Sequence, residues 1–217
     1  LKGENGVKSV TVNSDGTTKV EYTKEVKNGD SIVLTLDADM QKVAQDALKE
    51  KCDSIESPVP HGGAVAVVNC KTGELLACAT YPSYDITTYS DDYSSLLKDK
   101  RSPLWNRALQ SVYAPGSTSK PSTALAALEE GVIDENTVHD CHYKFRYLDM
   151  TFSCIAHHAS SNINVKTALQ DSCNIFFYKV SRDLGVEKLN TYRELLGLGQ
   201  PTGIELSERT GILDSPS

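Results

Sequence analysis

The sequence predicts an α+β fold: an antiparallel sheet with packed helices, together with an all-helical subdomain. Two short apolar stretches at 63–68 and 74–80, separated by the turn-forming residues 69–73, predict a β-hairpin. From about residue 117 onward helical patterns dominate, and glycines separate them. No internal repeat or low-complexity tract interrupts this order, so a mixed architecture of sheet and helices is the natural prediction.

The predicted elements follow in order along the chain. Residues 32–36 predict a strand, and Asp37 or Asp39 is placed to cap a helix through 41–48. The second half predicts three further helices, at 123–130, 165–169 and 175–180.

Length and composition bound the domain organisation and the partners. The chain of 217 residues is long enough for one large domain. The polar residues 1–30 contain short alternating pieces, so we assign them to the tail of a preceding domain or a linker, and 31–217 to the main domain. A net charge of -7 argues against a nucleic-acid partner and leaves no basic patch for a membrane. No signal peptide or apolar run of membrane-spanning length is present, so we expect any anchor to lie outside this sequence.

The segment Ser117-Thr118-Ser119-Lys120 pairs a hydroxyl with an amine three residues later. Where the chain turns helical at Ser117, both side chains lie on one face, and a base lies within reach of a nucleophile. Pro115-Gly116 marks a turn just before the serine, so the first helical N–H groups point at its hydroxyl and favour an oxyanion. We therefore predict a serine acyl-enzyme; the structural alternative is an N-cap serine beside a solvated lysine.

Ser-x-x-Lys and Ser-x-Asn each occur twice in the sequence. Ser95-Leu96-Leu97-Lys98 lies in a polar stretch without turn residues ahead of it, and we expect an exposed connector without a catalytic role. Ser172-Cys173-Asn174 falls in a tight loop between two predicted helices, whereas Ser160-Ser161-Asn162 lies in a polar stretch before them. Placement favours Ser172 and Asn174 as functional residues over the alternative of a capping serine and asparagine.

Together these residues resemble the transpeptidase domain of penicillin-binding proteins, whose signature joins Ser-x-x-Lys, Ser-x-Asn and Lys-Thr-Gly. The lead-in 1–6 resembles the end of the non-catalytic domain in the class B, monofunctional members. The resemblance covers nearly the whole chain through the stretches 34–37, 72–77, 81–85, 106–108 and 197–204. It implies a peptidoglycan D,D-transpeptidase that cross-links stem peptides and is a target of β-lactam antibiotics. It also implies partner proteins of cell-wall synthesis, a place at the extracytoplasmic face of the bacterial cell membrane, and no required cofactor.

The resemblance also implies a role for each site residue. Ser117 attacks the substrate, and Lys120 accepts its proton, for which the lysine pKa must fall well below about 10.4. Ser172 relays a proton to the departing D-alanine, and Asn174 holds the substrate's amide. The backbone N–H of Ser117 supplies one oxyanion donor.

The third motif departs from the family pattern. The Lys-Thr-Gly motif occurs at Lys71-Thr72-Gly73, but this copy precedes the nucleophile in the sequence. The similar Arg209-Thr210-Gly211 follows Asn174 at a shorter distance than the family's motif does. We expect both to be structural. The family's own copy lies on a later strand that supplies the second oxyanion donor, so we expect this chain to be a C-terminally truncated piece with an incomplete fold that is inactive, or nearly so, alone.

Cys141, Cys154, His157 and His158 gather ahead of the Ser172 motif with a spacing that loosely resembles zinc sites. Three interpretations stay open: a structural zinc that braces the Ser172 loop, a Cys141–Cys154 disulfide, and free thiols. We expect Cys173 to be a packed small side chain rather than a second nucleophile.

Two other functions compete with the transpeptidase. A β-lactamase or a penicillin-sensing receptor shares Ser-x-x-Lys, and a non-catalytic scaffold in a cell-wall complex needs no chemistry. The lead-in 1–6 and the hairpin 72–85 favour the transpeptidase.

Overall fold

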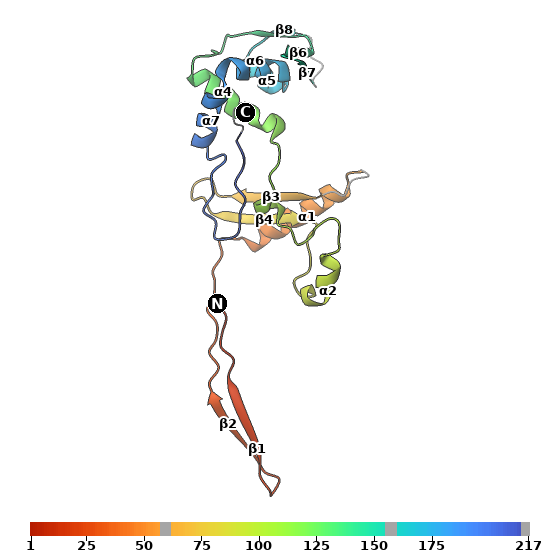
Figure 1. Ribbon diagram of the computed structural model, residues 1–217, viewed down its shortest axis with the longest axis vertical. Helices are drawn as coiled ribbons and strands as arrows, with labels where there is room; N and C mark the ends of the chain where they lie inside the picture. Colours follow the sequence, from red (N-terminus) through yellow and green to blue (C-terminus); the bar gives the residue numbers. More distant parts are fainter. Residues whose placement is uncertain (57–61, 155–159, 214–217) are drawn as a thin grey trace. The chain divides into compact units, whose positions relative to one another are not determined.

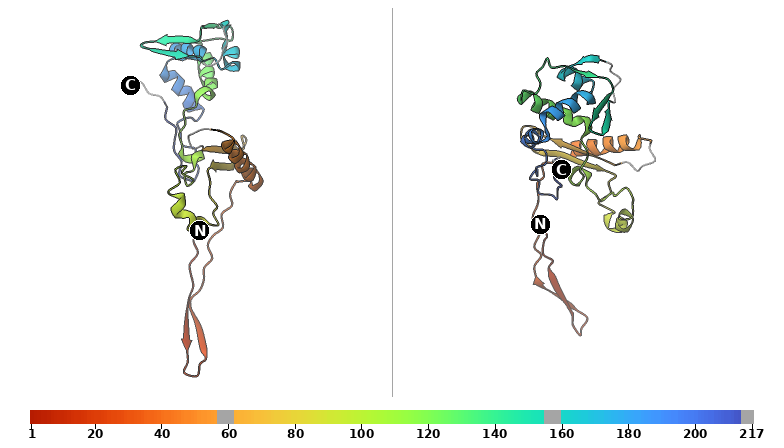
Figure 2. Two further views of the ribbon diagram at one scale, coloured as in Figure 1. Left: turned by 90° about the vertical axis from the view of Figure 1, so that its right-hand side faces the viewer. Right: turned by 45° about the horizontal axis from the view of Figure 1, so that its top comes forward.

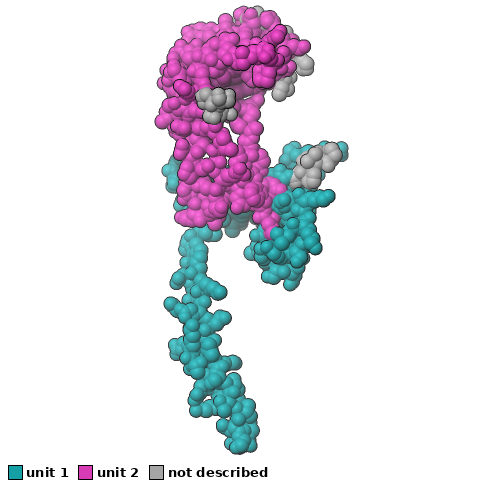
Figure 3. Space-filling view, viewed as in Figure 1, with its two compact units in different colours: residues 1–103 teal, residues 104–217 magenta. Residues whose placement is uncertain are grey.

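The computed structural model describes residues 1–56, 62–154 and 160–213, and the chain divides into two compact units at 103/104 (Figure 3). The first unit contains β1 (Val7–Val12), β2 (Thr18–Lys24), α1 (Ala38–Asp53), β3 (Gly63–Val68), β4 (Leu75–Tyr81) and α2 (Tyr89–Leu96). The second contains α3 (Arg107–Gln110), η1 (Gly116–Ser119), α4 (Lys120–Glu129), β5 (His139–Cys141), β6 (Lys144–Tyr147), β7 (Met150–Ser153), β8 (Ser160–Ile163), α5 (Val165–Gln170), α6 (Asn174–Leu184) and α7 (Val186–Leu195).

The lead-in forms a two-stranded hairpin, as its alternating pieces predict. β1 and β2 form an antiparallel hairpin (Figure 1). Val10 lies opposite Val20 in its register. Both strands are exposed along their whole length. The proposed boundary between a lead-in and a main domain near residue 30 stays a prediction.

Helix α1 packs on the hairpin of β3 and β4 (Figure 1). Asp37 caps the helix by accepting a hydrogen bond from Met40 N, which confirms one of the two predicted caps. Ala44 of the helix packs against the buried Ala77 and Ala79 of β4. Gln41 fixes the position of α1 along β4, because its side-chain amide exchanges two hydrogen bonds with the backbone of Cys78, at 2.7 and 3.1 Å. The predicted hairpin and helix are therefore confirmed.

The strand predicted at 32–36 does not form, which corrects the sequence prediction. The segment runs beside β4, but its links are single hydrogen bonds, from Thr35 Oγ1 to Leu75 O and from Asp37 N to Leu76 O. Its apolar side chains stay in solvent, and Val33 is 95% exposed. A run of β-branched residues forms a strand only where its backbone pairs with a neighbouring strand and one of its faces is buried. Among the described residues, this segment has neither a strand partner nor a buried face.

The core of the second unit lies where α4 meets α5, α6 and α7 (Figures 1 and 2). Alanines at the contacts, Ala126 and Ala127 of α4 and Ala168 of α5, are fully buried and let the backbones approach closely. Phe176 and Val180 of α6 fill the space between the helices. Two small antiparallel sheets, β5–β8 and β6–β7, border this helical core.

None of the helices in the described ranges combines the length and the apolar character that crossing a membrane requires.

Candidate active site

The nucleophile motif sits at the junction of two helical turns. η1 is a 3₁₀ turn, and α4 begins at Lys120 directly after it. Side chains three residues apart are eclipsed in a 3₁₀ turn, so Ser117 and Lys120 point the same way. Lys120 Nζ donates a hydrogen bond of 3.1 Å to Ser117 Oγ. The predicted pairing of hydroxyl and amine is therefore present in the structure.

The loop between α5 and α6 brings the second motif to the same lysine. Lys120 Nζ also lies within hydrogen-bond distance of Ser172 O at 2.7 Å, Ser172 Oγ at 2.9 Å and Asn174 Oδ1 at 2.7 Å, so its three N–H groups are shared among four acceptors. Ser172 Oγ in turn donates to Ser117 Oγ at 3.0 Å. Four side chains predicted as site residues thus converge on one point, although more than fifty residues separate the two motifs.

Backbone geometry holds this loop in place. Ser172 adopts a φ of 53°, in the left-handed region that residues with a side chain rarely occupy. The turn is held by the hydrogen bond from Cys173 N to Ala168 O, 2.9 Å, and by the Cys173 sulfur, which accepts one from Phe176 N. A strained residue that neighbouring bonds hold in one conformation is typical of functional sites.

Burial changes the chemistry of Lys120. The residue is only 8% exposed, and its desolvation lowers the pKa of the amine from its ordinary value. The nearby thiols of Cys154 and Cys173 act in the opposite direction and raise it, with a smaller effect. A lysine with a lowered pKa is neutral in more molecules at neutral pH, which is the state in which it can take a proton.

Asn174 is held from two sides. Its Oδ1 accepts from Lys120, and its Nδ2 donates to Ser153 O at 3.3 Å. Its backbone N–H donates to Cys154 Sγ at 3.4 Å. The end of β7 therefore orients the side-chain amide of Asn174. The residue types at 153–154 form no motif that would have predicted this role.

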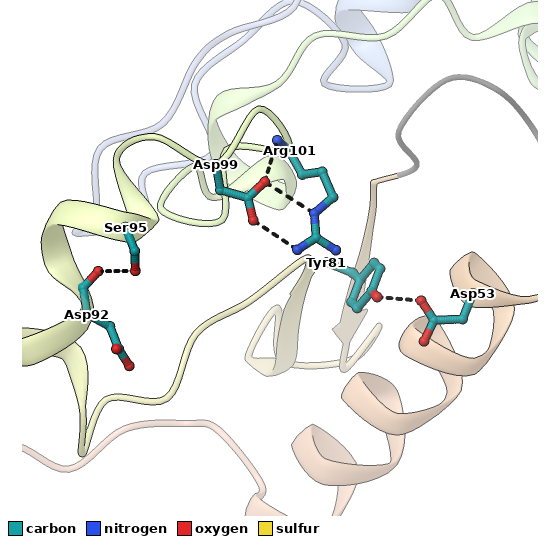
Figure 4. A network of polar contacts seen from close by, with 6 residues as sticks. All are labelled: Asp53, Tyr81, Asp92, Ser95, Asp99 and Arg101. Atoms are coloured by element: carbon teal, nitrogen blue, oxygen red, sulfur yellow. Dashed lines mark hydrogen bonds and ion pairs between the residues drawn. The ribbon is translucent and has the colours of Figure 1, made fainter.

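Two further copies of motif sequences belong to the first compact unit, whereas Ser117 and Ser172 belong to the second. Ser95 donates its hydroxyl to Asp92 O within α2, at 2.7 Å, and Asp99 pairs with Arg101 nearby (Figure 4). The expected connector is thus a helix, but it is exposed and Ser95 has its partner within the helix. Lys71-Thr72-Gly73 lies in the exposed turn between β3 and β4, which confirms the predicted turn, and its purely structural role stays a prediction.

The cysteine cluster differs from the one predicted. Cys141 and Cys154 come together as expected, and Cys173 joins them, with the three sulfurs within 4.8 Å of one another. His157 and His158 lie outside the described residues. None of the six cysteines, all of which lie in the described ranges, is part of a disulfide, so the Cys141–Cys154 disulfide is not formed. Cys173 is fully buried, as predicted, and burial raises the pKa of its thiol to about 12.

Comparisons with known proteins identify the family to which the chain belongs. The family model described as "Penicillin binding protein transpeptidase domain" matches residues 63–216. The chain is 35% identical to the "Peptidoglycan D,D-transpeptidase MrdA" of Escherichia coli strain K12, over 96% of this chain and 32% of that protein. The chain thus spans about a third of the length of that curated relative.

Solved structures share the fold. A chain from "Structural coordination of polymerization and crosslinking by a peptidoglycan synthase complex" matches with a TM-score of 0.79 and 33% identity, over 98% of this chain and 40% of that one. PBP2 of Pseudomonas aeruginosa, in complex with WCK 5153, matches with a TM-score of 0.74 and 28% identity, over 88% of this chain and 43% of that one. The predicted α+β fold class is thereby confirmed, and the chain belongs to the family of penicillin-binding protein transpeptidase domains.

Proposed function

We propose that this chain belongs to a class B peptidoglycan D,D-transpeptidase, which works through a serine acyl-enzyme on Ser117. The observation that carries the proposal is the contact of Ser117 Oγ with the buried amine of Lys120, which Ser172 and Asn174 enclose from the other side. The relatives named D,D-transpeptidase and the family model support the same activity.

In the acylation step the hydrogen bond between Ser117 and Lys120 reverses its direction, because a neutral amine accepts the hydroxyl proton. Ser117 Oγ attacks the carbonyl carbon of the penultimate D-alanine in a stem peptide, and neutral Lys120 takes the hydroxyl proton. The C–N bond to the terminal D-alanine breaks. Ser172, which hydrogen-bonds both Ser117 and Lys120, passes the proton to the leaving amine. The products are an ester on Ser117 and free D-alanine.

The second step transfers the acyl group. An amine from a neighbouring stem peptide attacks the ester carbonyl, the Ser117–acyl bond breaks, and Ser117 Oγ regains a proton through the same residues. In this proposal Asn174 Nδ2 gives up its hydrogen bond to Ser153 O and donates instead to the amide oxygen of the acyl donor. A β-lactam enters the first step because its strained amide reacts in the same way.

The setting of the protein follows from the same proposal. Stem peptides lie outside the cytoplasmic membrane, so the domain, which we assign to 31–217, works at its extracytoplasmic face. Partners from cell-wall synthesis are expected, in line with the peptidoglycan synthase complex among the structural neighbours.

The test uses the protein as the cell makes it, with a peptide ending in D-Ala-D-Ala and an acceptor amine. We expect free D-alanine and a cross-linked product, both lost in Ser117→Ala and kept in Ser95→Ala. Rapid turnover of a β-lactam would instead identify a β-lactamase. A wild-type protein that forms no acyl-enzyme would leave the scaffold as the function.

We further propose a structural zinc at Cys141, Cys154 and Cys173. Zinc binds thiolates at about 2.3 Å in tetrahedral sites, which separates the sulfurs by roughly 3.8 Å. Sulfurs within 4.8 Å of one another need only small side-chain rotations to reach that geometry. Burial raises the pKa of the Cys173 thiol to about 12, so zinc binding would have to displace its proton. The bound ion would fix the residues that orient Asn174.

Elemental analysis tests the zinc. We expect about one zinc per chain in protein purified without chelators, lost in Cys141→Ser and retained in the control Cys70→Ser, whose thiol is exposed in a turn. Wild-type protein without zinc, or equal zinc in both variants, would contradict the site.

A further inference from the structure

A buried aromatic ring lies beside the amine of Lys120. Lys120 Nζ sits 5.8 Å from the centroid of the Phe177 ring, over its face. Phe177 is 4% exposed and follows Asn174 by three residues in α6, so both side chains lie on one side of that helix. A cation within about 6 Å of a ring centroid is attracted by the negative face of the ring.

We propose that Phe177 is a positioning residue for Lys120, whose ring face holds the amine and stabilises the charge that develops as it accepts the Ser117 proton. The inference rests on the proposed function, in which Lys120 is the base. It adds a residue that belongs to neither motif and that the sequence alone marks only as core.

The surroundings of Lys120 explain why a ring suits this position. The oxygens that accept its hydrogen bonds are hydroxyl, carbonyl and amide oxygens, and all of them are neutral. The titratable groups that face it are the thiols of Cys154 and Cys173. Burial disfavours the ammonium form. The two thiols offset the effect of burial only in part, because the pKa of the amine stays below its ordinary value. A base whose charged form is stabilised too little holds the proton it has taken only weakly.

A carboxylate at the same place would compensate too strongly. A buried ion pair favours the charged lysine by a large margin, so the amine could not return to the neutral state that acylation requires. A cation–π contact is weaker, and it takes up no proton of its own. The ring therefore lets Lys120 cycle between its two states.

Neighbouring packing keeps the ring in place. Phe176 contacts Phe177 edge-to-face, with centroids 5.3 Å apart and an interplanar angle of 74°. Phe176 is as buried as Phe177, and among the described contacts its ring partners are Phe177 and His139 rather than a lysine. It therefore serves as a matched control in the same helix.

The test replaces Phe177 in the complete protein with 4-fluoro-, 3,5-difluoro- and 3,4,5-trifluorophenylalanine. Fluorine withdraws density from the ring face while shape changes little. We expect the maximal rate of acylation by a penicillin to fall stepwise along the series. The acid limb of the pH–rate profile should move stepwise to lower pH, by about half a unit to one and a half units in total. A merely structural role predicts no such graded shift. The same series at Phe176 should leave the limb in place.

A second measurement does not depend on acylation. The amine of Lys120 is titrated by ¹³C NMR in protein with labelled lysine, its signal assigned by its loss in Lys120→Arg. The lysine pKa should fall along the Phe177 series and stay constant along the Phe176 series. An unchanged pKa, or equal changes in both series, would overturn the inference. Absence of acylation in the wild-type protein would overturn the proposed function instead, and the titration would still decide the role of Phe177.

Discussion

Lys120 Nζ lies 2.7 Å from the main-chain oxygen of Ser172, and the same serine offers its hydroxyl to that nitrogen at 2.9 Å. One residue supplies two acceptors to the lysine because its backbone is in the left-handed region, with a φ of 53°. Such a conformation costs about 1–3 kcal/mol for a residue with a side chain. The conformation that aligns the two motifs therefore lowers the stability of the folded protein.

Two variants at Ser172 separate the hydroxyl from the backbone. Ser172→Ala and Ser172→Gly both remove the proton relay, so each should lower the acylation rate by about 10²–10⁴-fold. Glycine tolerates a positive φ, so Ser172→Gly should be about 1 kcal/mol more stable than Ser172→Ala. Urea unfolding and stopped-flow acylation measure the two effects. Equal stability of the pair would argue against stored strain, and full activity in either variant against the relay.

The lowered pKa of Lys120 predicts how the rate depends on pH. Only the neutral amine accepts the proton, so acylation should rise with pH through the pKa of the folded protein, below the ordinary value near 10.4. Asn174→Asp would place a carboxylate at the position of Asn174 Oδ1, 2.7 Å from Nζ. An adjacent negative charge stabilises the ammonium, so the acid limb should move to higher pH by about one to three units. A limb that stays in place, or moves to lower pH, would exclude Lys120 as the base.

Substitution of the lysine itself gives a direct comparison between the two copies of the motif. Arginine keeps its charge at all accessible pH values and cannot act as a base. Lys120→Arg should therefore lower acylation by about 10²–10⁴-fold and abolish the acid limb, whereas the exposed Lys98→Arg should match the wild type. A similar loss in both variants would mean that the assay reports a general effect of the substitution.

The helical core that supports the site should be sensitive to cavities. Phe176 is 1% exposed, and its truncation to alanine should cost about 3–5 kcal/mol in the free energy of unfolding. Leu148, which is 77% exposed at the β6–β7 turn, is the control, and Leu148→Ala should stay within about 0.5 kcal/mol. Denaturant titration checks both, and a cost below about 1 kcal/mol at Phe176 would contradict its place in the core.

Local signals explain which elements the sequence could predict. The helices at 120–129 and 174–184 follow from helix formers bounded by turn residues, and the hairpin of β3 and β4 from two apolar runs around one turn. The same kind of signal was misleading at Ile32–Leu36, because this apolar segment does not pair with a neighbouring strand among the described residues. The strands between 139 and 163 escaped prediction because each is only three or four residues long and polar in part.

Only those candidate site residues that belong to short sequence motifs could be predicted. The motifs, and their positions beside predicted helices, point to Ser117, Lys120, Ser172 and Asn174. Contacts that depend on tertiary packing could not be predicted: Ser153 holds Asn174 through its main-chain oxygen, and any residue type offers that atom. The approach of Phe177 to Lys120 likewise arises from how α6 packs on α4, which no local pattern encodes.

The nucleophilic role of Ser117 is tested most directly by mapping where a penicillin binds. The protein as the cell makes it is incubated with a fluorescent penicillin, digested, and sequenced by mass spectrometry. We expect one adduct per chain on the peptide that contains Ser117, absent in Ser117→Ala and unchanged in Ser95→Ala. An adduct on any other residue, or one that persists in Ser117→Ala, would contradict this role.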